Sequence, residues 1–319
     1  MDALTGPLRL RPYYTLAPSE ARLQPSFADG VVAATQIAGR SPPILSGIAT
    51  REIQVAGAAG PIPARVYRPT DAPVGVPLPV IVYFHGGGWV IADRNVYDAS
   101  ARALARESSA VVLSVDYRRA PEFRFPAQHD DALASYRWTV ANAPSIGGDP
   151  ARIAVAGESA GGNLAIATAI AARDAGLPAP IHILSIYPIA GSDLNTPSYQ
   201  ENANAMPLNR AAMAWFLHHT LRTDADASDP RINLVAANLS GLPPVTIIAA
   251  QIDPLRSEGE MLTERLRAAG VTVERREYPR VTHEFFGSDM LLPEAKTAQV
   301  YAGARLRAAF VRNIADPTK

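Results

Sequence analysis

A serine flanked by glycines stands where a strand-like run meets a helical pattern. The apolar run Arg152–Ala156 leads into the sequence Gly-Glu-Ser-Ala-Gly centred on Ser159, and a segment of helical period follows. A Gly-x-Ser-x-Gly sequence between a strand and a helix is typical of a sharp turn that exposes a nucleophilic serine, because the glycines leave room for both elements. The alternative is a glycine-rich turn whose serine only caps the helix. In this context we favour the nucleophile, with the Ala160 N–H near the positive end of the helix.

Three consecutive glycines follow another apolar run. Val80–Phe84 is followed by His85 and then by Gly86, Gly87 and Gly88. Acyl transfer develops negative charge on a carbonyl oxygen, and bare glycine backbone lets N–H groups turn toward that oxygen. The alternative is a flexible turn, which three glycines would form at a high cost in conformational entropy. We therefore predict an oxyanion hole in this loop and expect His85 to anchor it.

These segments belong to a longer series of motifs. The series comprises His85–Trp89, Asp116–Glu122, Phe125–Ala127, Gly157–Asn163, Tyr187-Pro188, Asp253–Arg256 and His283–Phe285. On these motifs the chain resembles the hormone-sensitive-lipase-like esterases, the bacterial family IV of the α/β-hydrolase superfamily. The resemblance implies an α/β-hydrolase fold, with a mostly parallel central sheet flanked by helices and a helical cap. It also implies a serine carboxylesterase that acts on short- to medium-chain acyl esters. Three residues depart from the family pattern: Glu158 replaces Asp or Thr, Ser257 a frequent Asp, and Glu284 a common Gly.

A nucleophilic serine requires a base and an acid, which follow it in the order acid then histidine in this superfamily. Asp253 follows the run Val245–Ala250, and His283 lies on a loop expected to begin near Pro279. Asp253 falls at the carboxyl edge of the sheet, where open α/β sheets bind ligands. Taken alone, Asp253 could be a helix cap and His283 a surface or core residue. Glu258 is the alternative acid.

We therefore predict that His283 takes the proton of Ser159, which attacks the ester carbonyl, while Asp253 orients His283. The predicted oxyanion hole comprises the N–H groups of Gly87, Gly88 and Ala160. Two alternatives remain open. The same triad could hydrolyse amides, lactones or peptides, or the chain could be a non-catalytic protein that binds a small molecule on this fold. The presence of His283 at the expected place argues against the second.

Apolar side chains next to these motifs, or in the insertion expected to form part of the cap, are candidates for the substrate pocket. They are Trp89, Met206, Leu208, Trp215 and Phe285. For Met213, Phe216 and Leu217, helical spacing favours packing in the core instead. No metal or other cofactor is expected. The chain has no cysteine and no glycine-rich nucleotide-binding motif after a strand. The expected partner is a small-molecule ester.

The elements that must position these residues alternate along the chain. Strands are predicted at 64–67, 80–85, 110–116, 152–156, 181–187, 245–250 and 271–277. Helices are predicted at 95–107, 127–141, 160–175, 257–269 and 294–311. Most strands are nearly continuous β-branched runs, as strands buried on both faces should be. The alternation predicts a largely parallel sheet covered by helices on both faces.

Two regions break this alternation and are expected to form the cap. Residues 1–46 carry helix-compatible stretches before the first strand, and residues 190–230 lie in an insertion with one plausible helix at 209–221. The insertion runs for about 55 residues, far longer than an ordinary loop. The catalytic core then comprises residues 47–189 and 231–319.

Composition excludes several classes of protein. Of 319 residues, 48% are hydrophobic and 19% charged, so disorder is not expected. The chain has 30 Lys and Arg against 30 Asp and Glu, which argues against a nucleic-acid partner. No apolar stretch is long enough for a membrane span, and no secretory signal precedes the first strand. We expect a cytoplasmic protein, with a homodimer as a possibility.

Overall fold

The structure is a computed structural model that describes residues 11–39, 47–73 and 75–315, with side chains up to residue 311. Its centre is an eight-stranded sheet with the order β1-β2-β4-β3-β5-β6-β7-β8. The strands are β1 (Ile48–Gly57), β2 (Gly60–Pro69), β3 (Leu78–Phe84), β4 (Val111–Val115), β5 (Gly148–Glu158), β6 (Ile183–Ile186), β7 (Val245–Ile252) and β8 (Val273–Thr282). Neighbours from β4 to β8 are parallel, whereas β2 is antiparallel to both β1 and β4. The mostly parallel sheet predicted from the sequence is therefore confirmed.

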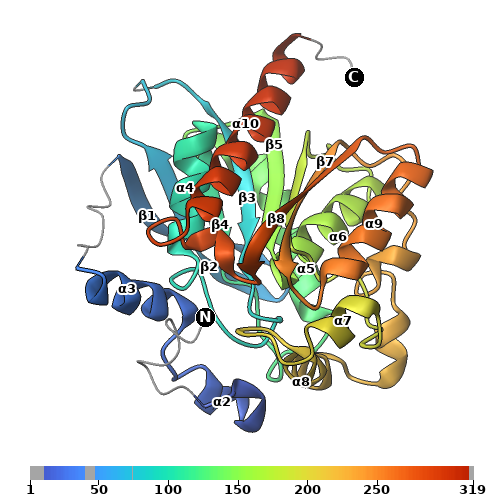
Figure 1. The fold of residues 1–319 in the computed structure, drawn as a ribbon. Helices are drawn as coiled ribbons and strands as arrows, with labels where there is room; N and C mark the ends of the chain where they lie inside the picture. Colours follow the sequence, from blue (N-terminus) through green and yellow to red (C-terminus); the bar gives the residue numbers. More distant parts are fainter. Residues whose placement is uncertain (1–10, 40–46, 74, 316–319) are drawn as a thin grey trace.

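Helices cover both faces of this sheet (Figure 1). On one face, α4 (Asp98–Ser108) packs against α10 (Pro293–Ala315). On the other face lie α5 (Ala127–Asn142), α6 (Ala160–Asp174) and α9 (Arg256–Ala268). Short 3-10 turns occur at η3 (Ala143–Ile146), η4 (Asp224–Ser228), η5 (Leu234–Ala236) and η6 (Phe285–Gly287).

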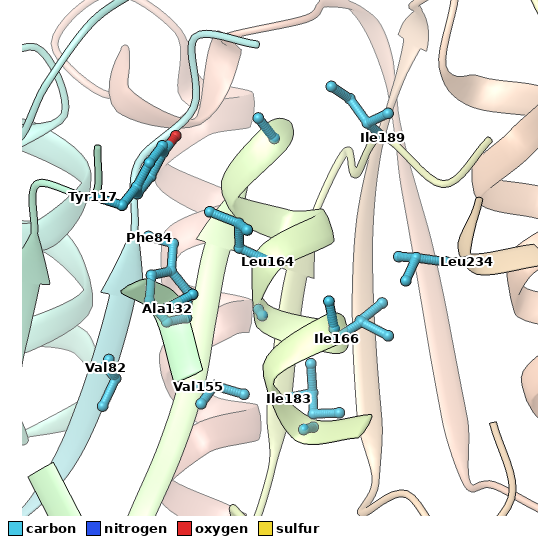
Figure 2. Packing of buried hydrophobic residues seen from close by; sticks show 14 of the residues in the cluster. Val82, Phe84, Tyr117, Ala132, Val155, Leu164, Ile166, Ile183, Ile189 and Leu234 are labelled. Carbon is cyan, nitrogen blue, oxygen red and sulfur yellow. The ribbon is translucent and has the colours of Figure 1, made fainter. Parts of the chain in front are cut away.

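Strand β3 shows why both faces need a helical layer. Val80, Val82 and Phe84 belong to the core on the α5 and α6 side, where Figure 2 shows Phe84 near Leu164 of α6. Ile81 and Tyr83 point to the opposite face and pack with α4 and α10. Successive side chains of a strand alternate between faces, so a strand covered twice must be apolar at every position.

Strand β1 differs from the sequence-based prediction, which has no strand at residues 48–57. It lies at the edge of the sheet and pairs only with β2, through a hairpin in which Gly57 stands opposite Gly60. Most of its side chains are exposed or half-buried. An edge strand with little buried surface does not require a continuous apolar run, which is the signal used to predict the other strands.

The two segments expected to form the cap lie side by side. The described part of the first contains η2 (Tyr13–Thr15), α2 (Pro18–Ala21) and α3 (Phe27–Ile37), and residues 1–10 and 40–46 lie outside the described residues. The second contains α7 (Pro197–Glu201) and α8 (Arg210–Thr220). Trp215 Nε1 donates to the Leu16 carbonyl at 3.2 Å, and the Tyr13 ring packs against Trp215. Helices α2, α7 and α8 thus gather at one end of the sheet (Figure 1).

Candidate active site

Ser159 lies at the sharp turn between β5 and α6. Its backbone has φ 56° and ψ −116°, a conformation that strains any residue with a side chain. The Ser159 N–H donates to the Ile186 carbonyl of β6 at 2.9 Å, which fixes the turn against the sheet. The hydroxyl is therefore presented beyond the carboxyl end of β5, in the strand–turn–helix arrangement that the sequence predicts.

Two glycines allow this turn to form. A Cβ atom at Gly157 would overlap the backbone of Gly161, and one at Gly161 would overlap the carbonyl of Phe84 at the end of β3. Helix α6 can therefore start directly against the ends of two strands only because both positions lack a side chain. A larger residue at either position would displace Ser159.

Asp253, His283 and Ser159 form a continuous chain of hydrogen bonds. The distance from His283 Nε2 to Ser159 Oγ is 2.9 Å, and that from His283 Nδ1 to Asp253 Oδ2 is 2.8 Å. The second carboxylate oxygen of Asp253 accepts the Leu255 N–H at 2.9 Å. When Nδ1 donates its proton to Asp253, the lone pair of Nε2 faces the serine hydroxyl. The arrangement can therefore remove a proton from Ser159.

Strand ends hold the acid and the base in place. Asp253 directly follows β7, and His283 directly follows β8, which runs to Thr282. The expectation that a loop begins near Pro279 is wrong, because β8 continues past it and Thr282 pairs with Ile252 of β7. His283 is thus attached to the sheet itself and not to a free loop.

The alternative acid, Glu258, lies away from this chain of hydrogen bonds. It is fully buried in α9, where its Oε1 accepts the Ala190 N–H at 2.9 Å, and burial raises its pKa well above the ordinary carboxyl value. His129 Nε2 contacts Asn163 Oδ1 at 3.0 Å. Glu258 and His129 therefore each have a partner outside the hydrogen bonds that join Asp253, His283 and Ser159.

The glycine loop after β3 faces the same cavity as Ser159. Gly87 and Gly88 line this cavity and have positive φ angles of 92° and 58°. A Cβ atom at Gly88 would overlap the ring of Phe216. Ala160 is the first residue of α6, where backbone N–H groups lack partners within the helix. Gly87 and Gly88 thus line the same cavity as Ser159, and Ala160 directly follows Ser159 in the chain.

His85 packs beneath the glycine loop and contacts its backbone. Its ring stacks on Tyr117 with centroids 4.3 Å apart, and its Nδ1 lies 2.8 Å from the Gly86 carbonyl. The Tyr117 hydroxyl donates to the His85 carbonyl at 2.9 Å. Burial lowers the pKa of His85, so a neutral ring is favoured. These contacts agree with the anchoring role expected from the sequence.

A cavity of about 460 Å³ opens over Ser159 and His283. The core and both segments expected to form the cap contribute to its wall. The residues from the two segments include Tyr13, Tyr14, Arg22, Met206, Leu208 and Phe216. Met206 and Leu208 thus lie where the sequence places them. Phe216, expected in the core, is buried and also lines the cavity.

Three predicted pocket residues lie outside this lining. Trp89 is fully buried in the core behind the oxyanion loop, and Phe285 packs against the rings of Tyr187 and Tyr278. Trp215 points toward the N-terminal segment. Trp89 and Phe285 were expected in the pocket because they follow motifs, and Trp215 because it lies in the insertion. The backbone at Trp89 has a positive φ of 62°.

Arg22 fastens the N-terminal segment to the loops beside the cavity. Its guanidinium donates to the Val90 carbonyl at 2.8 Å and to the Ala120 carbonyl at 2.6 Å. It also pairs with Glu122 at 2.7 Å. Val90 lies two residues after Gly88, so the segment around Arg22 is attached directly to the loop that carries Gly87 and Gly88.

Two carboxyl groups, those of buried Glu158 and half-buried Glu284, lie close to His283, and neither was singled out as a site residue from the sequence. Glu158 accepts hydrogen bonds from the hydroxyls of Tyr83, at 2.5 Å, and Tyr187. Burial and then the charge of Glu284 raise the pKa of Glu158 to about 7. Glu284 lines the cavity, and burial raises its pKa as well. Only their departure from the family pattern marked these residues.

The pH dependence of activity should reflect the surroundings of His283. Burial lowers its pKa, but the charge of Asp253, their hydrogen bond and the charges of Glu284 and Glu158 outweigh burial and raise the pKa above its usual value. The base must be neutral to accept the serine proton. We therefore expect kcat/KM for an ester to fall with decreasing pH through an apparent pKa above about 6.5, and to level off at alkaline pH. A limb centred below that value in a pH-rate profile would contradict this.

The fold and the geometry of this site are those of an α/β hydrolase. The family model described as alpha/beta hydrolase fold matches residues 81–287, and the chain belongs to this family. The chain is 43% identical over 253 residues to the carboxylesterase NlhH of Mycobacterium tuberculosis, which covers 78% of this chain and 79% of that protein. It is 35% identical to an ethyl acetate hydrolase of Pseudomonas putida, over 73% of this chain and 74% of that protein.

Solved structures agree with these relatives. The esterase of Pyrobaculum calidifontis superimposes with a TM-score of 0.85 at 37% identity, covering 96% of this chain and 97% of that one. The resemblance to esterases is thereby confirmed, and the chain is an α/β-hydrolase carboxylesterase.

The part of the chain that the structure describes contains neither a metal-binding cluster nor a helix able to span a membrane. Within residues 11–39, 47–73 and 75–311, no group of three or more His, Asp or Glu side chains is arranged to hold a metal ion. Among the described helices, none has both the length and the apolar character that crossing a bilayer requires.

Proposed function

We propose that the protein hydrolyses short- to medium-chain carboxylic esters through a triad of Ser159, His283 and Asp253. His283 Nε2 takes the serine proton as Oγ attacks the ester carbonyl, and Asp253 stabilises the imidazolium. His283 then protonates the departing alcohol, which leaves an acyl group on Ser159. Water repeats these steps and releases the acid. The observation that carries this proposal is the hydrogen-bond chain that ends on Ser159 Oγ within the cavity.

We assign the oxyanion hole to the N–H groups of Gly87, Gly88 and Ala160. Positive φ angles at both glycines turn the loop backbone, and Ala160 adds the positive end of α6. Preorganised donors of this kind stabilise charge that develops only in the transition state.

The cavity supports a limit on acyl length. At about 460 Å³ it lies near the lower end of the usual range for small-molecule sites, roughly 300 to 1,000 Å³. Met206, Leu208 and Phe216 give part of its wall an apolar character. The similarity to a protein named ethyl acetate hydrolase also supports the proposal that this protein acts on small esters. We propose that residues 1–46 and 190–230 act as the cap that closes this space.

A panel of p-nitrophenyl esters of increasing acyl length tests the substrate class. Each buried methylene contributes about 0.8 kcal/mol, so kcat/KM should rise a few-fold per carbon until the cavity is filled and then fall. We expect the maximum at about four to eight acyl carbons. Phe216→Ala should move it to longer chains, because that ring occupies the space over Gly88.

Leu217→Ala provides the matched control for this panel. Leu217 is the next residue of α8 and is also buried, but it does not line the cavity. Its loss should leave the preferred length unchanged. A steady rise in kcat/KM to long-chain lipid esters in the unaltered protein would contradict the proposed limit.

Matched esters and anilides separate ester hydrolysis from amide hydrolysis on the same triad. We expect turnover of the ester to exceed that of the anilide by several orders of magnitude. Labelling of Ser159 by an organophosphate, located by mass spectrometry, distinguishes an enzyme from a non-catalytic binding protein. Labelling elsewhere, or none, would overturn the proposed nucleophile.

A further inference from the structure

The carboxyl group of Glu284 stands beside the atom that performs the proton transfers. Glu284 Oε1 is 3.8 Å from His283 Nε2, and Glu284 lines the same cavity as Ser159. The Tyr97 hydroxyl lies 2.7 and 2.8 Å from the two carboxyl oxygens and fixes the group in this position. Burial raises the pKa of Tyr97 far above its usual value, so this hydroxyl keeps its proton and remains a donor.

The backbone at Glu284 adds a second observation. Its φ of 71° lies in the left-handed region, which glycine adopts freely and residues with a side chain adopt at a cost. Strained backbone of this kind is concentrated at functional sites, where the surrounding structure maintains it. Here the strain holds a carboxyl group, and not a bare backbone, next to His283.

The spacing of the two acceptors suits one particular reactant. After Ser159 is acylated, Nε2 of His283 no longer faces a serine hydroxyl and can accept a proton from an incoming nucleophile. One oxygen atom about 2.8 Å from each acceptor can bridge the 3.8 Å between Nε2 and Glu284 Oε1. Water carries two protons and can donate to both acceptors, whereas an alcohol carries one and can donate to only one.

We propose that Glu284 is the second acceptor for the hydrolytic water and thereby favours hydrolysis of the acyl-enzyme over transfer of the acyl group to alcohols. This inference rests on the acyl-enzyme mechanism of the proposed function. The water oxygen forms a bond to the acyl carbon while one water proton passes to His283 Nε2. The second proton stays on that oxygen and is hydrogen-bonded to Glu284. The bond from the acyl carbon to Ser159 Oγ then breaks as His283 returns its proton to Oγ.

Partition of the acyl group between water and methanol tests the proposal. The protein turns over a p-nitrophenyl ester with methanol present, at a pH on the alkaline plateau of kcat/KM, above the raised pKa values of His283 and Glu284. The ratio of methyl ester to free acid depends only on steps after acylation. A hydrogen bond to a charged group is worth enough that its loss should change this ratio on the order of tenfold. We expect Glu284→Gly and Glu284→Gln to raise the ratio by this amount.

Two further variants sharpen the result. Tyr97→Phe removes the hydroxyl that fixes the carboxyl group and should raise the ratio by less than Glu284→Gly. Asp93→Asn is the matched control, because Asp93 also lines the cavity but its carboxylate accepts the N–H groups of Asn95 and Val96. It should leave the ratio unchanged.

The outcomes separate this inference from the proposed function. Methyl ester formed by all variants in the wild-type proportion would overturn the role of Glu284 and leave the acyl-enzyme mechanism intact. An equal rise with Asp93→Asn would also overturn it, because any cavity charge would then have the same effect. Free acid without methyl ester from every variant, at any methanol concentration, would overturn the acyl-enzyme step and the inference with it.

Discussion

Replacement of Ser159 or His283 by alanine is expected to lower kcat for ester hydrolysis on the order of 10⁶-fold, and the double variant should be hardly worse than either single one. The two side chains are joined by a hydrogen bond of 2.9 Å, and in the proposed triad they act as one unit. In that mechanism Ser159 cannot attack the ester without the proton acceptor His283, and His283 has no nucleophile to activate without Ser159. Steady-state kinetics on a p-nitrophenyl ester, with folding checked by circular dichroism, measures the three losses.

Ser185→Ala is the matched control for these variants. Ser185 is a buried serine of β6, and its hydroxyl donates to the Gly162 carbonyl at 2.9 Å, close to the turn but outside the proposed triad. Its loss should cost stability of about 1 kcal/mol and leave kcat nearly unchanged. Losses that multiplied in the double variant of Ser159 and His283 would show that the two residues act independently.

Asp253→Asn should lower kcat by up to about 10⁴-fold while KM changes little. The carboxylate fixes the His283 tautomer by accepting Nδ1–H at 2.8 Å. An amide can donate its own N–H to Nδ1, which leaves the proton on Nε2 and removes the base that faces Ser159. Kinetics above the pKa of His283 isolates this effect from protonation of the ring.

Glu258→Gln distinguishes the two candidate acids. The Glu258 carboxyl is buried in α9 and accepts the Ala190 N–H, so an amide oxygen can replace it there. We expect kcat within a few-fold of the unaltered protein. A large loss with Glu258→Gln, together with near-normal activity of Asp253→Asn, would make Glu258 the acid.

Much of the fold could be predicted because its central strands are covered on both sides. In β3 every position after Leu78 is buried, which gives the continuous apolar run that identifies the strand. Strand β1 could not be found in this way, because an edge strand buries few side chains. The end of β8 was placed too early for a similar reason: its exposed positions outnumber its buried ones.

The candidate site was predictable to the extent that local sequence determines its geometry. The turn around Ser159 requires glycine at positions 157 and 161, so the sequence reveals it. The order of residues along the chain then suggested Asp253 as the acid and His283 as the base. The residues of the cavity wall were harder to predict from the sequence. Trp89 was expected there because it follows the oxyanion glycines, whereas its side chain turns into the core.

Local sequence patterns could not predict which side chains from distant parts of the chain contact the site. Tyr13 reaches the cavity wall only because its ring packs against α8, some 200 residues later in the chain. Glu284 could be noted as unusual, but its approach to His283 depends on a backbone conformation that residue type alone does not reveal. Such contacts follow from tertiary packing, which a single sequence does not show.

The attachment made by Arg22 means that the two ends of the chain are not equivalent for protein engineering. An affinity tag or reporter fused at the amino end lies next to a segment whose Tyr13 and Tyr14 line the cavity. Arg22 of the same segment binds the loop after Gly87 and Gly88, the glycines proposed for the oxyanion hole. Helix α10, in contrast, ends on the side of the molecule opposite α2 and α8 (Figure 1). Immobilisation and fusion therefore belong at the carboxyl end. Libraries that aim at a new substrate range belong in the first segment, where substitutions change the cavity wall and spare the proposed triad.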